Sequence, residues 1–86
     1  MKFYVHTVKD PLGIHARPAG QIAKLAKEYA DTAIAFACND KEAKATSLMK
    51  LMSLGAKEGT EITITAEGAN EEAAIIAMSQ FVNNNL

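Results

Sequence analysis

The sequence has no tryptophan, only two prolines and a single cysteine among its 86 residues. Because Cys38 stands alone, it cannot form a disulfide within the chain, and the composition does not indicate an oxidising compartment. No apolar run is long enough to span a bilayer, and the N-terminal residues do not form a signal peptide. We therefore expect a cytoplasmic protein without a membrane-inserted segment.

The chain also lacks a strong excess of either charge. Nine basic and ten acidic residues give a net charge of −1, which argues against bulk electrostatic binding to nucleic acid or to an anionic membrane. A local basic patch stays compatible with this balance. The sequence contains neither a glycine-rich phosphate-binding loop nor a His/Cys/Asp cluster with metal-ligand spacing, so no cofactor and no metal ion are predicted.

The length predicts a single domain over residues 1–86, and we expect a monomer. Hydrophobic residues make up 49% of the chain, and many of them are alanines, so the core should be built from small side chains. A domain of this size buries only about 60% of the surface of its unfolded chain, so its stability margin is thin.

Hydrophobic periodicity predicts an α+β fold with the order β-α-β-β-α-β-α. The expected strands cover residues 2–8, 32–38, 41–45 and 60–66, and the expected helices cover residues 16–29, 47–54 and 70 onward. Alternation places Ile34 with Phe36, and Ile62 with Ile64, on buried faces of their strands. Because long crossover helices do not separate all strands, we expect a four-stranded, mainly antiparallel sheet with the three helices on one face.

Local signals mark the ends of these elements. Asn39–Asp40 suits a tight turn, because both residue types tolerate left-handed conformations. Either Thr46 or Ser47 can cap the second helix, and Gly55 can end it. Asn70 can cap the last helix, whose apolar stripe is predicted as Ala74, Ile75, Met78, Phe81 and Val82.

The segment GIHARPAG, residues 13–20, places two cationic side chains at the start of the first helix. That end of a helix has unpaired N–H groups and a partial positive charge, so it favours an anion rather than a cation. A nucleophilic imidazole at His15, with the guanidinium of Arg17 beside it, would suit phosphoryl transfer. Alternatively, His15 only caps the helix and Arg17 is solvated. The residues alone leave both interpretations open.

GIHARPAG resembles the active-site segment of HPr, the histidine-containing phosphocarrier family of the phosphoenolpyruvate:sugar phosphotransferase system. TSLMKLMSLG, residues 46–55, resembles the second signature of that family, around its regulatory serine. GTEITITAEGANEEAA, residues 59–74, is similar to its last strand and the start of its last helix. The similarity runs from about Phe3 to Val82. It implies an open-faced β-sandwich, in agreement with the predicted element order.

The resemblance also implies roles for individual residues. His15 would take a phosphoryl group on Nδ1 from enzyme I, which obtains it from phosphoenolpyruvate, and pass it to sugar-specific EIIA domains. Arg17 would accompany the phosphoryl group. Ser47 matches the serine that an ATP-dependent HPr kinase modifies in relatives. Such a protein is a phosphoryl carrier rather than an enzyme.

Two further groups of residues are candidates for binding these partners. Lys24 and Lys27 lie on the same side of the first helix as Arg17, and they form either an ordinary solvated face or a patch that attracts acidic partners. In the second helix, Leu51 and Leu54 can face the core, which leaves the other apolar residues exposed for docking. This docking set is Leu48, Met49 and Met52, with Gly20 leaving space for a partner.

Three positions depart from the family pattern. Leu12 stands where many relatives have a serine or asparagine, Thr46 precedes Ser47 where a lysine is expected, and the segment between Tyr29 and Ser47 is one residue longer.

An alternative function is a regulatory module of the same fold, which acts on a kinase or a transcriptional regulator through Ser47 without carrying phosphate. The presence of His15 favours the carrier. Neither His6 nor Cys38 is assigned a function.

Overall fold

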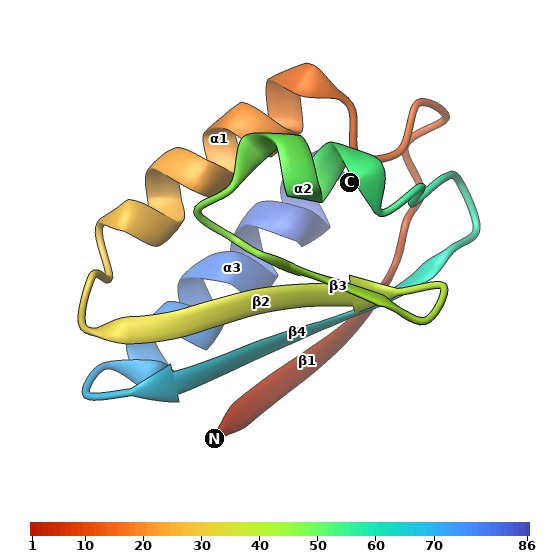
Figure 1. The fold of residues 1–86 in the computed structure, drawn as a ribbon. Coiled ribbons are helices and arrows are strands. Elements are labelled where there is room, and N and C mark those ends of the chain that lie inside the picture. The colour runs from red at the N-terminus through yellow and green to blue at the C-terminus, as the bar shows by residue number, and fades with distance from the viewer.

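The computed structural model describes every residue from Met1 to Leu86 and contains one four-stranded sheet with three helices. All three helices lie on the same side of the sheet, as Figure 1 shows, which confirms the predicted architecture and element order. The elements are β1 (Lys2–Thr7), α1 (Ala16–Lys27), β2 (Thr32–Cys38), β3 (Lys41–Lys44), α2 (Leu48–Ser53), β4 (Glu61–Gly68) and α3 (Glu71–Asn85).

The sheet has the strand order β1-β4-β2-β3, and every neighbouring pair is antiparallel. β2 and β3 form a hairpin closed by Asn39 and Asp40, whose φ angles are 51° and 62°. Two consecutive left-handed residues give the tight turn that matches the twist of a hairpin. The predicted turn is confirmed.

The core lies between the helices and the inner face of the sheet. Ile34, Phe36, Ile62 and Ile64 are buried on this face, as the alternation predicted. Leu51 of α2 and Leu54, the residue that follows this helix, are both buried, which confirms their expected place in the core. The helices α1 and α3 contribute Pro18, Ala19, Ile22, Ala23, Ala26, Ala74, Met78 and Val82. Of the predicted stripe, only Ile75 and Phe81 are partly exposed, packed at the margin of the core.

The ends of α2 follow the predicted signals. Ser47, rather than Thr46, is the N-cap, and its hydroxyl accepts a hydrogen bond from the N–H of Lys50 at 3.4 Å. Gly55 has a φ of 72° just after the helix, in the left-handed conformation that commonly ends a helix. Cys38 is buried behind this end of the helix, where its thiol donates to the carbonyl of Leu54.

The predicted side-chain cap of the last helix is wrong. Asn70 occupies the N-cap position, but its amide makes no hydrogen bond to the helix and instead donates to the carboxylate of Asp31, at 3.0 and 3.3 Å. The N–H of Asn70 donates to the hydroxyl of Thr32. A charged acceptor from the segment before β2 thus competes successfully with the local cap, because hydrogen bonds to ionised groups are stronger than neutral ones.

The first helix is shorter than predicted, ending at Lys27 instead of Tyr29. The N–H groups of Glu28 and Tyr29 donate to the carbonyls of Leu25 and Ala26, three residues back, so the chain tightens before it enters β2. None of the three helices is both long enough and apolar enough to cross a lipid bilayer.

Candidate functional site

His15 is the N-cap residue of α1. Its backbone is extended, with φ −103° and ψ −174°, and its carbonyl accepts a hydrogen bond from Ala19 N at 3.0 Å. The imidazole itself makes no capping hydrogen bond and is half-buried. His15 therefore occupies the cap position, but its side chain does not make the capping hydrogen bond. The backbone of His15 starts the helix, and the ring remains available.

The loop before His15 is held against the segment that follows α2. Ile14 N donates to the carbonyl of Ala56 at 3.1 Å, and Gly13 N donates to the carbonyl of Asp10 at 3.0 Å. Gly13 has a φ of 66°, and a Cβ atom placed on it would lie 2.0 Å from the Ala56 oxygen. Only glycine fits such a close approach of two backbones. This contact fixes where the chain presents His15.

A small polar cavity of about 300 Å³ adjoins the imidazole. It is lined by Asp10, His15, Arg17, Pro18, Gln21 and Asn85. His15 and Arg17 are thus brought to one cavity, as their positions in the motif suggested. The sequence-based reasoning missed the other three polar side chains. Gln21 lies one helical turn after Arg17, so helical spacing could have identified it.

The electrostatic character of this cavity comes from the first turn of α1. Pro18 has no N–H, and Ala19 N is already bonded to His15, so the N–H groups of Ala16 and Arg17 are the unpaired donors at this helix end. The turn contains no acidic residue. Unpaired amides and the helix dipole both favour an anion here, and the exposed guanidinium of Arg17 strengthens this preference.

Asp10 is the only carboxylate that lines the cavity. Its Oδ1 accepts a hydrogen bond from Leu12 N at 2.8 Å. The side chain of Leu12 is 71% exposed and does not line the cavity. A polar residue is therefore not needed at this position to close the loop, since Asp10 provides the local hydrogen bond.

The candidate docking residues surround the contact between α1 and α2. Met49 is 75% exposed and Met52 is 41% exposed, while Leu48 is 37% exposed. A Cβ atom on Gly20 would lie 3.5 Å from a methyl group of Leu48, which is an ordinary van der Waals contact. Gly20 and Leu48 belong to α1 and α2, which lie next to one another in Figure 1.

Lys24 and Lys27 are exposed in the last turn of α1. Cations stabilise this end of a helix through its dipole, which provides a structural reason for the two lysines in addition to partner binding. Together with Arg17 they make α1 basic on its exposed side without any acidic residue in the first turn.

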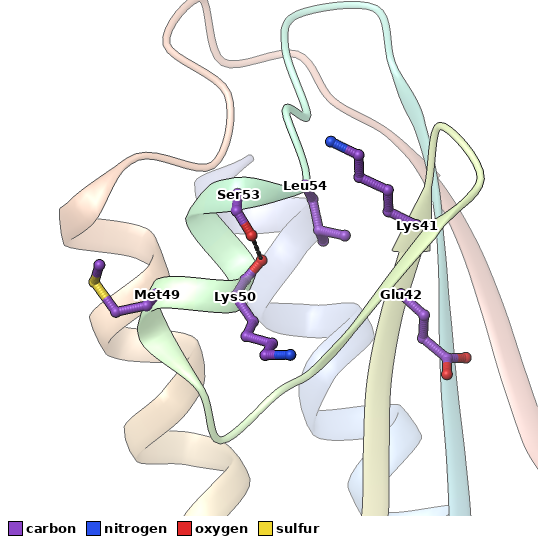
Figure 2. Close-up of a pocket in the computed structure, with 6 residues that line it drawn as sticks. All are labelled: Lys41, Glu42, Met49, Lys50, Ser53 and Leu54. Atoms are coloured by element: carbon purple, nitrogen blue, oxygen red, sulfur yellow. Dashed lines mark hydrogen bonds between the residues drawn. The ribbon is translucent and has the colours of Figure 1, made fainter.

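Ser47 lies in a different hollow, of about 370 Å³, lined by Glu42, Lys44, Ser47 and Lys50. A larger neighbouring cavity of about 560 Å³ separates α2 from β3 (Figure 2). Met49, Lys50 and Ser53 line this cavity on the side of α2, and Figure 2 shows Lys41 turned toward the end of that helix. Met49 thus borders this cavity and is also widely open to solvent.

No three His, Cys, Asp or Glu side chains come together in a way that could hold a metal ion.

Comparison with known proteins gives concordant results over nearly the whole chain. Residues 5–84 match the family model described as the PTS HPr component phosphorylation site. The phosphocarrier protein HPr of Mycoplasma pneumoniae is 44% identical over 78 residues, which is 91% of this chain and 89% of that protein.

Two solved structures show the same fold. The first is a histidine-containing phosphocarrier protein described in a study of the divergence of Mycoplasma from Gram-positive bacteria. It has a TM-score of 0.92 and 35% identity, over 96% of this chain and 93% of that one. The HPr dimer of Thermoanaerobacter tengcongensis has a TM-score of 0.75 and 33% identity, over 98% of this chain and 95% of that one.

Proposed function

The chain belongs to the HPr family of phosphocarriers, which serve the phosphotransferase system and are not themselves catalysts. From this premise we propose that His15 accepts a phosphoryl group from phosphorylated enzyme I, which draws it from phosphoenolpyruvate. His15 then passes it to sugar-specific EIIA domains. The transfer would take place in the cytoplasm, with one chain as the carrier unit.

The observation that carries this proposal is the setting of the imidazole at the start of α1. The ring of His15 makes no capping hydrogen bond and adjoins a polar cavity that it shares with Arg17. When a ring nitrogen forms the bond to phosphorus, the bond between phosphorus and the donor breaks, and three phosphoryl oxygens need donors. The free N–H groups of Ala16 and Arg17 and the guanidinium of Arg17 are donors of the required type.

Partners would approach across the exposed side of α1 and α2. Met49 and Met52 offer adaptable apolar contacts, and Lys24 and Lys27 attract acidic surfaces. Since both sets lie on the exposed sides of these two neighbouring helices, one docking geometry would serve enzyme I and the EIIA domains in turn. Exchanging Lys24 and Lys27 for glutamate should slow association with enzyme I at low salt, and an unchanged rate would count against this surface.

The carrier proposal is tested by incubation with enzyme I and labelled phosphoenolpyruvate. The native chain should acquire acid-labile phosphate, and His15→Ala should acquire none. His6→Leu provides a matched control, because His6 is the only other histidine and is buried in β1. Label that persists in His15→Ala would contradict the proposal. A native chain that acquired no label would instead favour the alternative of a regulatory module that acts through protein binding.

We also propose that Ser47 is a site of regulation. Its hydroxyl caps α2, and Lys44 and Lys50 line the same hollow, so two cations could receive a phosphate there. The added charge would lie beside Met49 and repel acidic partners, including the EIIA domains. A kinase of the HPr kinase/phosphorylase class would add it from ATP, and a transcriptional regulator could then bind the modified form.

Mass spectrometry after incubation with such a kinase and ATP tests the regulatory site. Phosphate should appear on Ser47 and be absent from Ser47→Ala, while Ser53→Ala, which removes the other hydroxyl of α2, should still be modified. The absence of label on Ser47 of the native chain would reject this regulation without affecting the role of His15.

A further inference from the structure

The face of the sheet that the helices leave uncovered has a regular pattern of side chains. Strand pairing aligns two neighbouring rows across all four strands. The first row is Phe3, Thr65, Ala35 and Lys44, and the second is Val5, Thr63, Ala37 and Glu42. We call these eight residues the outer face. Each row thus runs from a bulky apolar residue on β1, through small residues on β4 and β2, to a charge on β3.

This outer face is open to solvent and is apolar at one edge. Phe3 is 69% exposed and Val5 is 43% exposed, although both belong to a regular strand. The centre of the outer face is recessed because its side chains, alanine and threonine, are small. A hollow of about 510 Å³ lies over Ala33, Ala35 and Thr65. An exposed apolar patch beside a shallow hollow is typical of a protein interaction site.

The two rows are complementary to each other under a twofold rotation. If the axis lies across the strands, midway between the rows, each residue of one row meets its counterpart in the other row of a second copy. Phe3 then meets Val5, Ala35 meets Ala37, and Lys44 meets Glu42 of the second copy. Apolar side chains oppose apolar ones, small oppose small, and opposite charges oppose each other twice. This is the isologous arrangement that closed dimers use.

We propose that the outer face binds a second copy of this chain, sheet against sheet, in a reversible dimer. Sheets that pack face to face keep their strands within about 30° of each other, which is compatible with this rotation. The Glu42–Lys44 pairs set the register, because shifting one copy by two residues along the strands would place like charges together, and reversing its strand order would place the charges against Phe3 and Val5. The dimer departs from the monomer that the sequence led us to expect.

The size and rim of the face make the dimer weak. Strands about 4.8 Å apart with a rise of about 3.4 Å per residue give a face of roughly 300 Å² per copy, about 600 Å² for both. Stable complexes bury at least about 1,200 Å² in total. At the rim, the same rotation brings Glu61 toward Glu67 of the second copy, which weakens the contact further. The dimer should therefore form only at high protein concentration.

The outer face lies across the sheet from α1 and α2, as Figure 1 shows. Dimer formation therefore leaves the His15 cavity of both copies open. The dimer does not depend on the proposed phosphoryl transfer, so an experiment that rejects one of these two proposals leaves the other unaffected.

Charge exchange on β3 provides the sharpest test, measured by sedimentation equilibrium over a range of concentrations at low salt. In Glu42→Lys, the new lysine of each copy would face Lys44 of the other copy, and association should weaken by about tenfold. Lys44→Glu would bring two glutamates together in the same way and should have a similar effect. The double variant Glu42→Lys/Lys44→Glu restores opposite charges and should return the dissociation constant to within about twofold of the native value. Glu67→Lys, which would face Glu61, should strengthen the dimer.

Lys41→Glu is the matched control, because Lys41 is on the same strand but turned to the opposite side. Figure 2 shows it directed toward α2, while Glu42 points away from that helix. This variant should associate like the native chain. Three results would overturn the proposal: a native chain that stays monomeric at every concentration, a double variant that fails to recover, or a slowly dissociating dimer, insensitive to these charges, formed by strand exchange.

Discussion

Asn85, at the end of α3, lines the same cavity as His15, at the start of α1. The two helix ends meet because a backbone oxygen of Leu86 accepts hydrogen bonds from the N–H groups of Lys9 and Asp10. This contact draws the end of the last helix against the loop that leads to His15. The side chain of Asn85 is itself engaged, since its amide donates to the carbonyl of Phe81 at 2.9 Å.

The cavity residues should therefore differ in their effect on phosphoryl transfer. Arg17→Ala removes a charged donor and should lower the transfer rate by roughly 10- to 100-fold, because a hydrogen bond to a charged group contributes about 1.5–3 kcal/mol. Asn85→Ala should change it by less than about threefold, since the amide of Asn85 is already bonded within its helix. Rapid-quench measurement of phosphoryl transfer from enzyme I checks both variants. Equal losses would show that Arg17 has no special part in the transfer.

The loop before His15 depends on the absence of a side chain at Gly13. Gly13→Ala should lower the free energy of unfolding by more than about 2 kcal/mol, because it adds a collision with the Ala56 carbonyl to the cost of a left-handed residue. Gly59→Ala is the control: Gly59 has a φ of 89° but nothing within 4 Å of an added Cβ atom, so only the backbone cost of about 1 kcal/mol applies. Urea denaturation measures both. A smaller loss for Gly13→Ala than for Gly59→Ala would contradict this role of the Ala56 contact.

The sequence predicted the elements of this fold well because its strongest signals are local. Alternation at Ile62 and Ile64 and the turn at Asn39 each depend on residues a few positions apart. Where an element depends on distant residues, the prediction was wrong or incomplete. Asn70 was expected to cap α3, yet Asp31 binds its amide.

The same distinction holds at the candidate site. The motif was enough to place His15 and Arg17 at one helix start, but Asn85 reaches their cavity only through the backbone contact of Leu86. No spacing in the sequence encodes that contact. The complementary rows of the outer face likewise became visible only with the strand register, which follows from the order β1-β4-β2-β3.

Glu71 should make stability depend on pH in the acidic range. The pKa of its carboxyl group is lowered, first by a hydrogen bond from the N-terminal amine, 3.0 Å away, and then by the N–H of Gly68. When folding lowers the pKa of a carboxyl group, the ionised group stabilises the fold at every pH above its pKa in the unfolded chain, here near 4.5. This stabilisation is lost as the pH falls through the lower pKa of the folded protein. Glu71→Gln should therefore be less stable than the native chain at pH 7, with the difference vanishing in strong acid.

Thermal unfolding at a series of pH values checks this dependence. Glu72→Gln serves as the control, since Glu72 is the exposed neighbour and makes no ion pair or hydrogen bond in the structure. A difference between Glu71→Gln and the native chain that stays constant down to strong acid would exclude the proposed linkage.

His6 is a buried polar residue that the fold does not satisfy. Its side chain is 6% exposed on the inner side of β1, and its Nε2 has no hydrogen-bond partner. A buried unpaired polar group costs about 1–3 kcal/mol, so replacing it by an apolar residue of similar size should raise the free energy of unfolding. We expect His6→Leu to be more stable by about 1 kcal/mol in urea denaturation, with phosphorylation by enzyme I unchanged. His6→Ala separates polarity from packing: it also removes the unpaired nitrogen but leaves a cavity, and should be less stable than His6→Leu. If His6→Leu unfolded more readily than the native chain, the ring nitrogen would have to be satisfied in solution, most simply by a buried water.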